Sequence, residues 1–354
     1  MAALGPSGEY LEPQRPAKLN HIDLFSGCGG NAYAFRDFTK ARLYCEIDPT
    51  ARAALRANMK AGLIGAAPVH GNVRTLLGSP AYAKAKAHRP LLVSGSWPCQ
   101  GNSTAGAMQG LWDKRSALLL DLCDVILDSD CDLFFMENVP QAATNESWDC
   151  IEKKLASRYI LKHAIISASD LGFPHVRKRF FAVGIKKGFD LFGLRFGGAP
   201  RLAPSSAHKE PPPRGQRTRP PGYEAKWRHL GNAVVPACSY YALLKLLGVG
   251  GTLLDAFRPW TGPSLVLIPT AWRPPKGTVP RDLSSPAITG PFHMRLWPTP
   301  RAGCYGAVHT LSYRTTRDLA SAVRFEKATP HQERAFVNID WLKWLMGYPP
   351  TWNC

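Results

Sequence analysis

Short apolar strands alternate with helical segments from His21 to Ile185, and this alternation restricts the possible fold more than any other feature. The stretch Leu91–Gln100 shows it best, because an apolar run ends at Gly95 and Pro98, where a fixed φ and a missing N–H stop a strand. Strands alternating with helices predict a mostly parallel sheet covered on both faces. The predicted fold class is therefore α/β, with ligands expected at the carboxyl edge of the sheet.

The remaining elements follow from hydrophobic periodicity and from Gly and Pro positions. Strands are predicted at Ile22–Phe25, Leu43–Glu46, Leu133–Met136, Tyr159–Ile166 and Arg179–Ile185. Helices are predicted from Gly30 to about Phe38, at Thr50–Met59, along the face of Leu118, Leu122, Val125 and Ile126, and at Ala237–Leu247.

The charge of the chain is strongly basic and unevenly distributed. The formal net charge is +18, and residues 186–301 hold 17 Lys and Arg against 5 Asp and Glu, a surplus of +12. Such a surplus favours a polyanionic partner, although on its own it also suits a membrane-surface protein.

Several sequence features bear on where the protein works. No apolar run reaches the roughly 18 residues that span a bilayer, and residues 1–16 lack the apolar core of a signal peptide, so we expect an intracellular protein with no membrane partner. The nine cysteines form no CxxC pair, which argues against a disulfide framework and a structural zinc site. No metal site is predicted.

Composition divides the chain into five predicted segments. They are a tail (1–18), the main α/β domain (19–190), a Pro- and Arg-rich linker (191–226), a helix returning to the main domain (227–248), and a smaller, basic, irregular β-containing domain (249–354).

A glycine-rich turn follows the first strand, in Asp23-Leu24-Phe25-Ser26-Gly27-Cys28-Gly29-Gly30. A strand, a glycine-rich turn and a helix can hold a nucleotide-like cofactor, although a purely structural turn is about as common. Glu46 ends the next strand, where an acid can accept hydrogen bonds from ribose hydroxyls, with a solvated surface acid as the alternative. The Lys-Ser/Thr phosphate-loop pattern is absent, which disfavours a triphosphate.

Cys99 and Glu137 each follow an apolar strand, so both are expected at one crevice. A thiolate there can act as a nucleophile, and a partly desolvated carboxyl can donate or share a proton. Arg177 and Arg179 can supply the basic field that activates a thiol. The alternatives are a small buried cysteine and a solvated charge cluster.

Five segments together resemble the DNA (cytosine-5) methyltransferase family. They are the glycine-rich turn, Pro98-Cys99-Gln100, Glu137-Asn138-Val139, Arg177-Lys178-Arg179, and Gly231-Asn232-Ala233-Val234-Val235-Pro236, with lesser matches at Cys45–Pro49 and Leu345–Pro349. The resemblance implies a Rossmann-like S-adenosylmethionine-dependent catalytic domain at 19–190 and a target-recognition domain at 249–354.

The resemblance also implies roles for individual residues. Cys99 would attack C6 of a flipped-out cytosine, Glu137 would engage N3 and the exocyclic amine, Arg179 would contact the base oxygen, and Arg177 would support the pocket. S-adenosyl-L-methionine would be the cofactor and double-stranded DNA the substrate of a monomer, with a cognate restriction endonuclease as a further expected partner in a restriction-modification system. The cofactor residues would be Phe25, Ser26, Gly27, Gly29, Glu46, Ile47, Asn72, Val73, Pro98, Asn232 and Val234. Expected DNA contacts are Gln100, Ser103, Arg295, Arg301, Arg314 and Arg317.

The chain departs from the family pattern in composition and in order. Trp97, Asn102 and His175 replace the family's usual Pro or Phe, Phe, and Gln, and Pro140-Gln141 replaces its usual glycine pattern. The Gly-Asn segment follows Arg179 by only about 50 residues, and the Met-Gly-Tyr-Pro segment comes last, which suggests a recognition domain moved to the C-terminus. A tRNA cytosine-5 methyltransferase and a catalytically idle regulatory protein that binds DNA or a partner remain alternatives.

Overall fold

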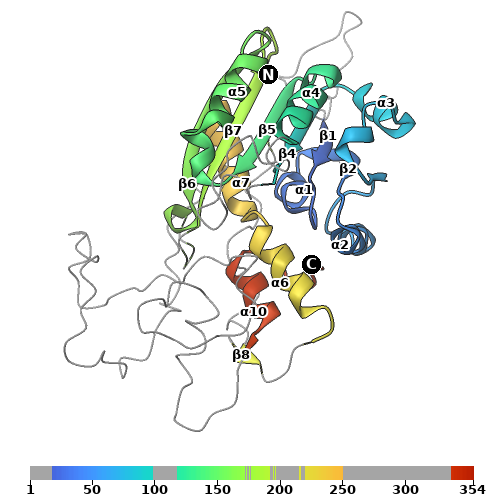
Figure 1. Cartoon of the computed structure of the whole chain (residues 1–354), viewed down its shortest axis with the longest axis vertical. Helices are drawn as coiled ribbons and strands as arrows, with labels where there is room; N and C mark the ends of the chain where they lie inside the picture. The colour runs from blue at the N-terminus through green and yellow to red at the C-terminus, as the bar shows by residue number, and fades with distance from the viewer. Residues whose placement is uncertain are drawn as a thin grey trace, which may run out of the picture.

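The structure is a computed structural model, and its centre is a seven-stranded sheet in the order β3-β2-β1-β4-β5-β7-β6 (Figure 1). It describes residues 18–98, 118–171, 177–191, 220–249 and 336–354, with 173, 175, 194, 196 and 215–216. The strands are β1 (Leu19–Leu24), β2 (Thr39–Cys45), β3 (Val69–His70), β4 (Leu91–Gly95), β5 (Leu133–Asn138), β6 (Tyr159–Ser167) and β7 (Lys178–Lys186). A separate short pair joins β8 (Gly215–Gln216) to β9 (Phe336–Val337).

The predicted α/β class is confirmed, with one pair of strands running the other way. β1 to β5 pair in parallel, whereas β7 is antiparallel to both β5 and β6. The chain between β6 and β7 contains only one described helical turn, Ala168–Leu171, and parallel neighbours need a longer crossover. The antiparallel β7 places its first residues at the edge where β4 and β5 end.

Helices cover both faces of the sheet, as predicted. One face packs against α1 (Gly30–Phe35), α2 (Pro49–Lys60) and α7 (Pro236–Leu247), the other against α3 (Pro80–Lys86), α4 (Leu118–Ser129) and α5 (Glu146–Leu155). Alternate residues of β5 point to the two faces of the sheet. The ring centroid of Phe135 lies 5.1 Å from that of Phe35 in α1, and Phe134 packs on the opposite face. Because both faces of β4 and β5 are buried, these strands read as continuous apolar runs.

The predicted helix boundaries need three corrections. The helix after the glycine-rich turn ends at Phe35 rather than near Phe38. A further helix, α6 (Tyr223–Asn232), begins within the predicted linker and precedes α7. The helix predicted at Ala237–Leu247 begins at Pro236, and this helix, α7, lies against α1, β6 and β7.

Residues Tyr223–Leu247 form the one segment in the described part of the chain that is long and apolar enough to span a membrane. The chain leaves the helical conformation at Ala233, and Pro236 then begins α7. Since 78% of its most apolar part is buried inside the protein, we interpret this segment as two helices of the core.

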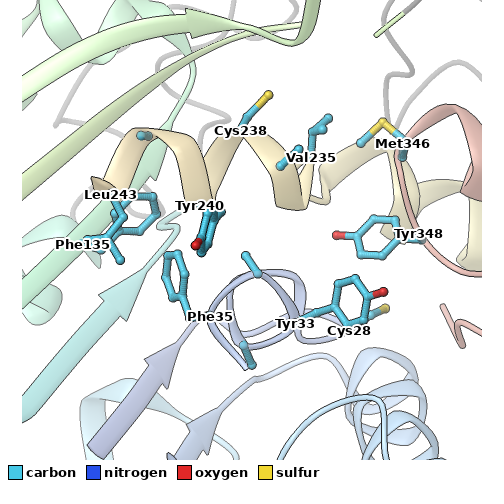
Figure 2. Packing of buried hydrophobic residues seen from close by; sticks show 14 of the residues in the cluster. Cys28, Tyr33, Phe35, Phe135, Val235, Cys238, Tyr240, Leu243, Met346 and Tyr348 are labelled. Atoms are coloured by element: carbon cyan, nitrogen blue, oxygen red, sulfur yellow. The ribbon is translucent and has the colours of Figure 1, made fainter. Parts of the chain in front are cut away.

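The end of the chain packs into the main core. Helix α10 (Ile339–Leu345) lies beside α6. Tyr348 lies next to Tyr33 of α1 (Figure 2). The ring of Trp352 stacks on that of Tyr348, with ring centroids 4.6 Å apart, and also contacts Tyr33. The five predicted segment boundaries stay a prediction, because residues 250–335 lie outside the described residues. The last residues of the predicted recognition domain nevertheless share a core with the sheet.

Gly30→Ala should lower the melting temperature because Gly30 has no room for a side chain. A Cβ there would lie 2.7 Å from Tyr348 Oη and 2.8 Å from Val234 Cγ2. We expect a loss of about 1–3 kcal/mol from overpacking. Gly78→Ala is the matched control, since a Cβ at Gly78 meets open space. Equal melting temperatures for the two variants would contradict this packing.

Candidate active site

The carboxyl ends of β1, β2, β4 and β5 and the amino end of β7 meet at one edge of the sheet. The register pairs Leu24 with Cys45 and with Gly95, and Asn138 with Phe180. This edge therefore brings together the glycine-rich turn, Glu46, Pro98, Glu137 and the arginine segment, which lie far apart in the sequence. It is the edge at which open α/β sheets bind ligands.

The glycine-rich turn has a backbone that few residues tolerate. Phe25, Gly27 and Gly29 have φ values of 53°, 53° and 94°. The positive φ of Phe25 costs about 1–3 kcal/mol, and such strain clusters at ligand sites. Ser26 steadies the turn because its hydroxyl donates to the carbonyl of Asp23 at 2.6 Å and its N–H donates to the carbonyl of Cys45 at 3.0 Å.

The carboxylate of Glu46 binds the same turn from the side of β2. Its Oε2 accepts from Gly27 N at 2.7 Å, and its Oε1 accepts from Asp48 N at 2.8 Å. Burial raises the pKa of this carboxyl, and hydrogen bonds from the backbone N–H groups of Asp48, Gly27 and Ile47 oppose that rise. Glu46 is therefore a positioned acceptor at the junction of two loops, unlike a solvated surface acid.

The residues around Glu46 form the rest of this end of the site. The Ile47 side chain is 68% exposed, which is unusual for a large apolar residue. Asn72 caps a short helical turn, accepting from Arg74 N at 3.1 Å. Val73 is buried in the core, so its side chain packs against the sheet.

Glu137 and Arg179 form an ion pair at the end of β5. Arg179 Nε lies 3.1 Å from Glu137 Oε1, with 18% and 6% of the two side chains exposed. β5 and β7 are neighbours in the sheet, and this pairing makes the contact possible. A largely desolvated pair is costly to leave unmatched, so each residue fixes the other.

Asn138 ties the end of β5 to the chain that leaves β4. Its Nδ2 donates to the carbonyl of Trp97 at 3.1 Å, and its Oδ1 accepts from Val139 N at 2.8 Å. Asn31 of α1 donates to Ser96 Oγ at 3.3 Å. Side chains of two neighbouring elements thus hold the segment that leads into Pro98.

Arg177 is buried and serves a different purpose from Arg179. Its Nη2 donates to the carbonyls of Gly231 at 3.0 Å and Ala233 at 2.6 Å. These carbonyls flank Asn232, which is exposed, and precede Val234, which is buried. Arg177 therefore links the arginine segment to the break between α6 and α7, which makes it a positioning residue.

His175 lies fully buried beside this link. Burial, reinforced by the nearby Arg177 charge, lowers the pKa of its imidazole to about 3. The ring is therefore neutral near pH 7 and adds no further positive charge to the arginine segment.

Residues 19–219, more than half of the chain, match the protein family described as C-5 cytosine-specific DNA methylase. The chain belongs to this family. The matched range includes the glycine-rich turn, Glu46, Glu137 and both arginines, which the structure gathers at one edge of the sheet. The resemblance noted from the sequence is thereby confirmed.

Individual relatives match about half of the chain. The type II methyltransferase M1.ScrFI of Lactococcus lactis subsp. cremoris is 29% identical over 183 residues, 50% of this chain and 44% of that protein. M.AquIA of Picosynechococcus sp. is 29% identical over 184 residues, 47% of this chain and 72% of that protein. The solved structure of the S. pombe Dnmt2 methyltransferase is 23% identical, has a TM-score of 0.39, and covers 49% of this chain and 52% of that one.

The residues around the glycine-rich turn fit the nucleoside part of the cofactor that methyltransferases of this family use. Both Glu46 oxygens accept backbone N–H groups, and a carboxylate has further lone pairs that can accept from donors such as ribose hydroxyls. A Cβ built at Gly27 meets no atom within 4 Å, so open space lies beside the turn. The exposed Ile47 offers an apolar surface for a base.

Some predicted site residues lie outside the described residues. They are Cys99, Gln100, Ser103, Arg295, Arg301, Arg314 and Arg317. Their assignments stay predictions, as do the individual roles of the cofactor residues.

The sequence alone did not identify the residues that hold the site together. Asn138 and Asn31, which hold the segment leading into Pro98, are two such residues. A polar residue inside an apolar stretch is a weak signal, because it does not say which distant backbone atom it will bind.

Proposed function

We propose that this chain transfers the methyl group of S-adenosyl-L-methionine to C5 of a cytosine flipped out of double-stranded DNA. The observation that carries the proposal is the Glu137–Arg179 ion pair, at the sheet edge where β4 leads into Trp97 and Pro98. In a member of this family, that pair provides a carboxyl and a guanidinium for one pyrimidine ring. M1.ScrFI and M.AquIA are longer than their matched regions, so the activity of this chain is inferred from its own site.

The reaction begins with a nucleophile. The Cys99 thiolate adds to C6, and the electron pair of the C5–C6 double bond becomes available at C5. Each cysteine in the described part of the chain has a thiol pKa raised by burial, which disfavours the thiolate (Cys28, Cys45, Cys123, Cys131, Cys150, Cys238 and Cys354). Two cysteines, Cys99 and Cys304, lie outside the described residues, and of these only Cys99 directly follows β4, whose carboxyl end lies at this edge, which supports Cys99 as the nucleophile.

Glu137 and Arg179 stabilise the base as charge moves through it. Glu137 shares a proton with N3 and accepts from the exocyclic amine, and Arg179 donates to the base oxygen. The bound cofactor supplies an electrophilic methyl group from its sulfonium. The C5 proton then passes to a solvent water, the electron pair of the C5–H bond restores the C5–C6 double bond, and Cys99 Sγ leaves C6 as the thiolate.

The substrate and compartment follow from the same proposal. Flipping a cytosine out of a duplex costs roughly a few kcal/mol, and the basic surplus of residues 186–301 favours a polyanionic partner. DNA as substrate places the protein in the DNA compartment of the cell. A paired restriction endonuclease and a monomeric state remain predictions.

Duplex DNA containing 5-fluorocytosine tests the proposal, because fluorine at C5 prevents the proton loss that would release the enzyme. A mixed-sequence duplex made with 5-fluoro-dCTP should give, with S-adenosyl-L-methionine, a covalent complex that survives a denaturing gel. The Cys99→Ala variant should give none. If the wild-type chain forms no complex with duplex DNA but methylates tRNA, the DNA assignment is wrong. If it modifies neither, the idle regulatory alternative gains support.

A further inference from the structure

The end of the chain is tied to the cofactor side of the site by buried hydrogen bonds. We call residues Ile339–Asn353 the C-terminal clasp. The clasp begins with α10 against α6, continues through Tyr348 and Trp352 against Tyr33, and ends at Asn353 against α2. Its contacts with α1, α2 and the α6–α7 break surround the glycine-rich turn.

Asn58 joins the clasp directly to that turn. Its side chain, fully buried on α2, donates through Nδ2 to the carbonyl of Cys28 at 3.0 Å and to the carbonyl of Asn353 at 2.9 Å. Its Oδ1 accepts from Asn353 N at 2.8 Å. Because Cys28 follows Gly27, Asn58 and Glu46 bind adjacent residues of the turn.

Tyr348 makes the second connection. Its hydroxyl donates to the carbonyl of Val234 at 2.9 Å in a buried position between α1 and the break before α7 (Figure 2). The same hydroxyl occupies the space that a side chain at Gly30 would need. Tyr348 therefore fixes the end of the turn against the segment after Asn232.

We propose that the C-terminal clasp is a working part of the methyl-donor site, in which Asn58 and Tyr348 are positioning residues for the glycine-rich turn. The inference rests on the proposed function, since it takes S-adenosyl-L-methionine as the ligand of that turn. The turn contains left-handed residues that an unrestrained chain populates poorly. Holding it in place before binding reduces the ordering cost of the ligand.

The expected signature is weaker cofactor binding with little change in the chemical step. By calorimetry, Asn58→Ala should raise the dissociation constant of S-adenosyl-L-methionine about tenfold, and Tyr348→Phe about threefold, as expected for lost buried hydrogen bonds. With tritiated cofactor and unmethylated mixed-sequence DNA, the KM for the cofactor should rise in parallel. The kcat and the KM for DNA should stay within about twofold.

Two controls separate positioning from general destabilisation. Asn145→Ala is the matched Asn-to-Ala change: it removes the side chain that caps α5, which packs on the other face of the sheet, so its cofactor affinity should match the wild type. Ile151→Ala opens the core on the other face of the sheet and should lower the melting temperature without weakening cofactor binding.

The outcomes distinguish this inference from the proposed function. If the wild type binds S-adenosyl-L-methionine and both Asn58→Ala and Tyr348→Phe bind it equally well, the clasp has no such role and the proposed function stands. If Asn58→Ala does not fold, Tyr348→Phe, which removes a single oxygen, decides the question. If the wild type shows no binding, the proposed function fails and this inference fails with it.

Discussion

Replacing Glu137 with Gln should lower the kcat for methyl transfer about 10²–10⁴-fold, the usual range for losing a positioned acid–base group. Gln keeps the shape of the side chain but cannot share a proton with N3. It also leaves Arg179, which lies 3.1 Å from Glu137 Oε1, without its opposite charge. Tritium transfer under single-turnover conditions measures the effect, and cofactor affinity should stay unchanged because Glu137 acts on the base.

Two comparisons sharpen the Glu137 experiment. Asp124→Asn breaks an exposed ion pair between Asp124 of α4 and Lys154 of α5 and should leave the rate within about twofold. Cys99→Ala should lose at least as much activity as Glu137→Gln, because without the thiolate no adduct forms. A Glu137→Gln enzyme with more than half of the wild-type rate would falsify the role we assign to this carboxyl.

The second large effect concerns a buried polar trio beneath the glycine-rich turn. The hydroxyl of Ser94 donates to Asp23 Oδ1 at 2.5 Å, and His21 Nε2 lies 2.8 Å from Ser94 Oγ. Burial raises the pKa of Asp23 to about 7 and lowers the pKa of His21 to about 3. At pH 5 the folded pair is therefore a neutral carboxylic acid and a neutral imidazole.

The two shifts have opposite effects on stability. The pKa of Asp23 is raised from 3.8 on folding, so its contribution to stability is fully present below pH 3.8 and is lost as the pH rises through 7. The pKa of His21 is lowered from 6.5 on folding, so its contribution to stability is fully present above pH 6.5 and is lost as the pH falls towards 3. Between about pH 4 and 6.5 the pair holds one proton in the folded state, on Asp23, and one in the unfolded state, on His21. Their opposite effects on the pH dependence of stability therefore cancel.

Single variants should therefore uncover slopes of opposite sign. In Asp23→Asn, His21 is the one member of the pair that still titrates. The unfolding free energy of this variant, relative to the wild type, should therefore rise with pH from 4 to 6.5 by up to about 1.4 kcal/mol per pH unit. In His21→Gln, Asp23 is the one member that still titrates, and the unfolding free energy of this variant relative to the wild type should fall with pH over the same window. Urea unfolding at several pH values measures both.

Ser94→Ala completes the test of the trio. It removes the hydroxyl between two buried groups and should destabilise the protein by about 1–3 kcal/mol or more, with both partners left unmatched. If the wild type and both single variants show parallel pH dependence, Asp23 and His21 do not carry the protonation states described here.

The sequence by itself determined the main-chain plan of the protein. Alternating apolar strands and helices predicted a largely parallel sheet, and the ends of the runs before Glu46, Pro98 and Glu137 placed these residues at one edge. These features are local, because periodicity, glycine and proline act on the chain within a few residues. The family segments could be identified for the same reason.

Only the tertiary structure decided which side chains meet. The reversed β7 brings Arg179 to Glu137, whereas Arg177, two residues earlier, binds the backbone at the α6–α7 break. Asn58 contacts Asn353 across 295 positions of the chain. Such pairs depend on how helices and strands pack in space, and no local pattern in the sequence encodes a partner at that distance.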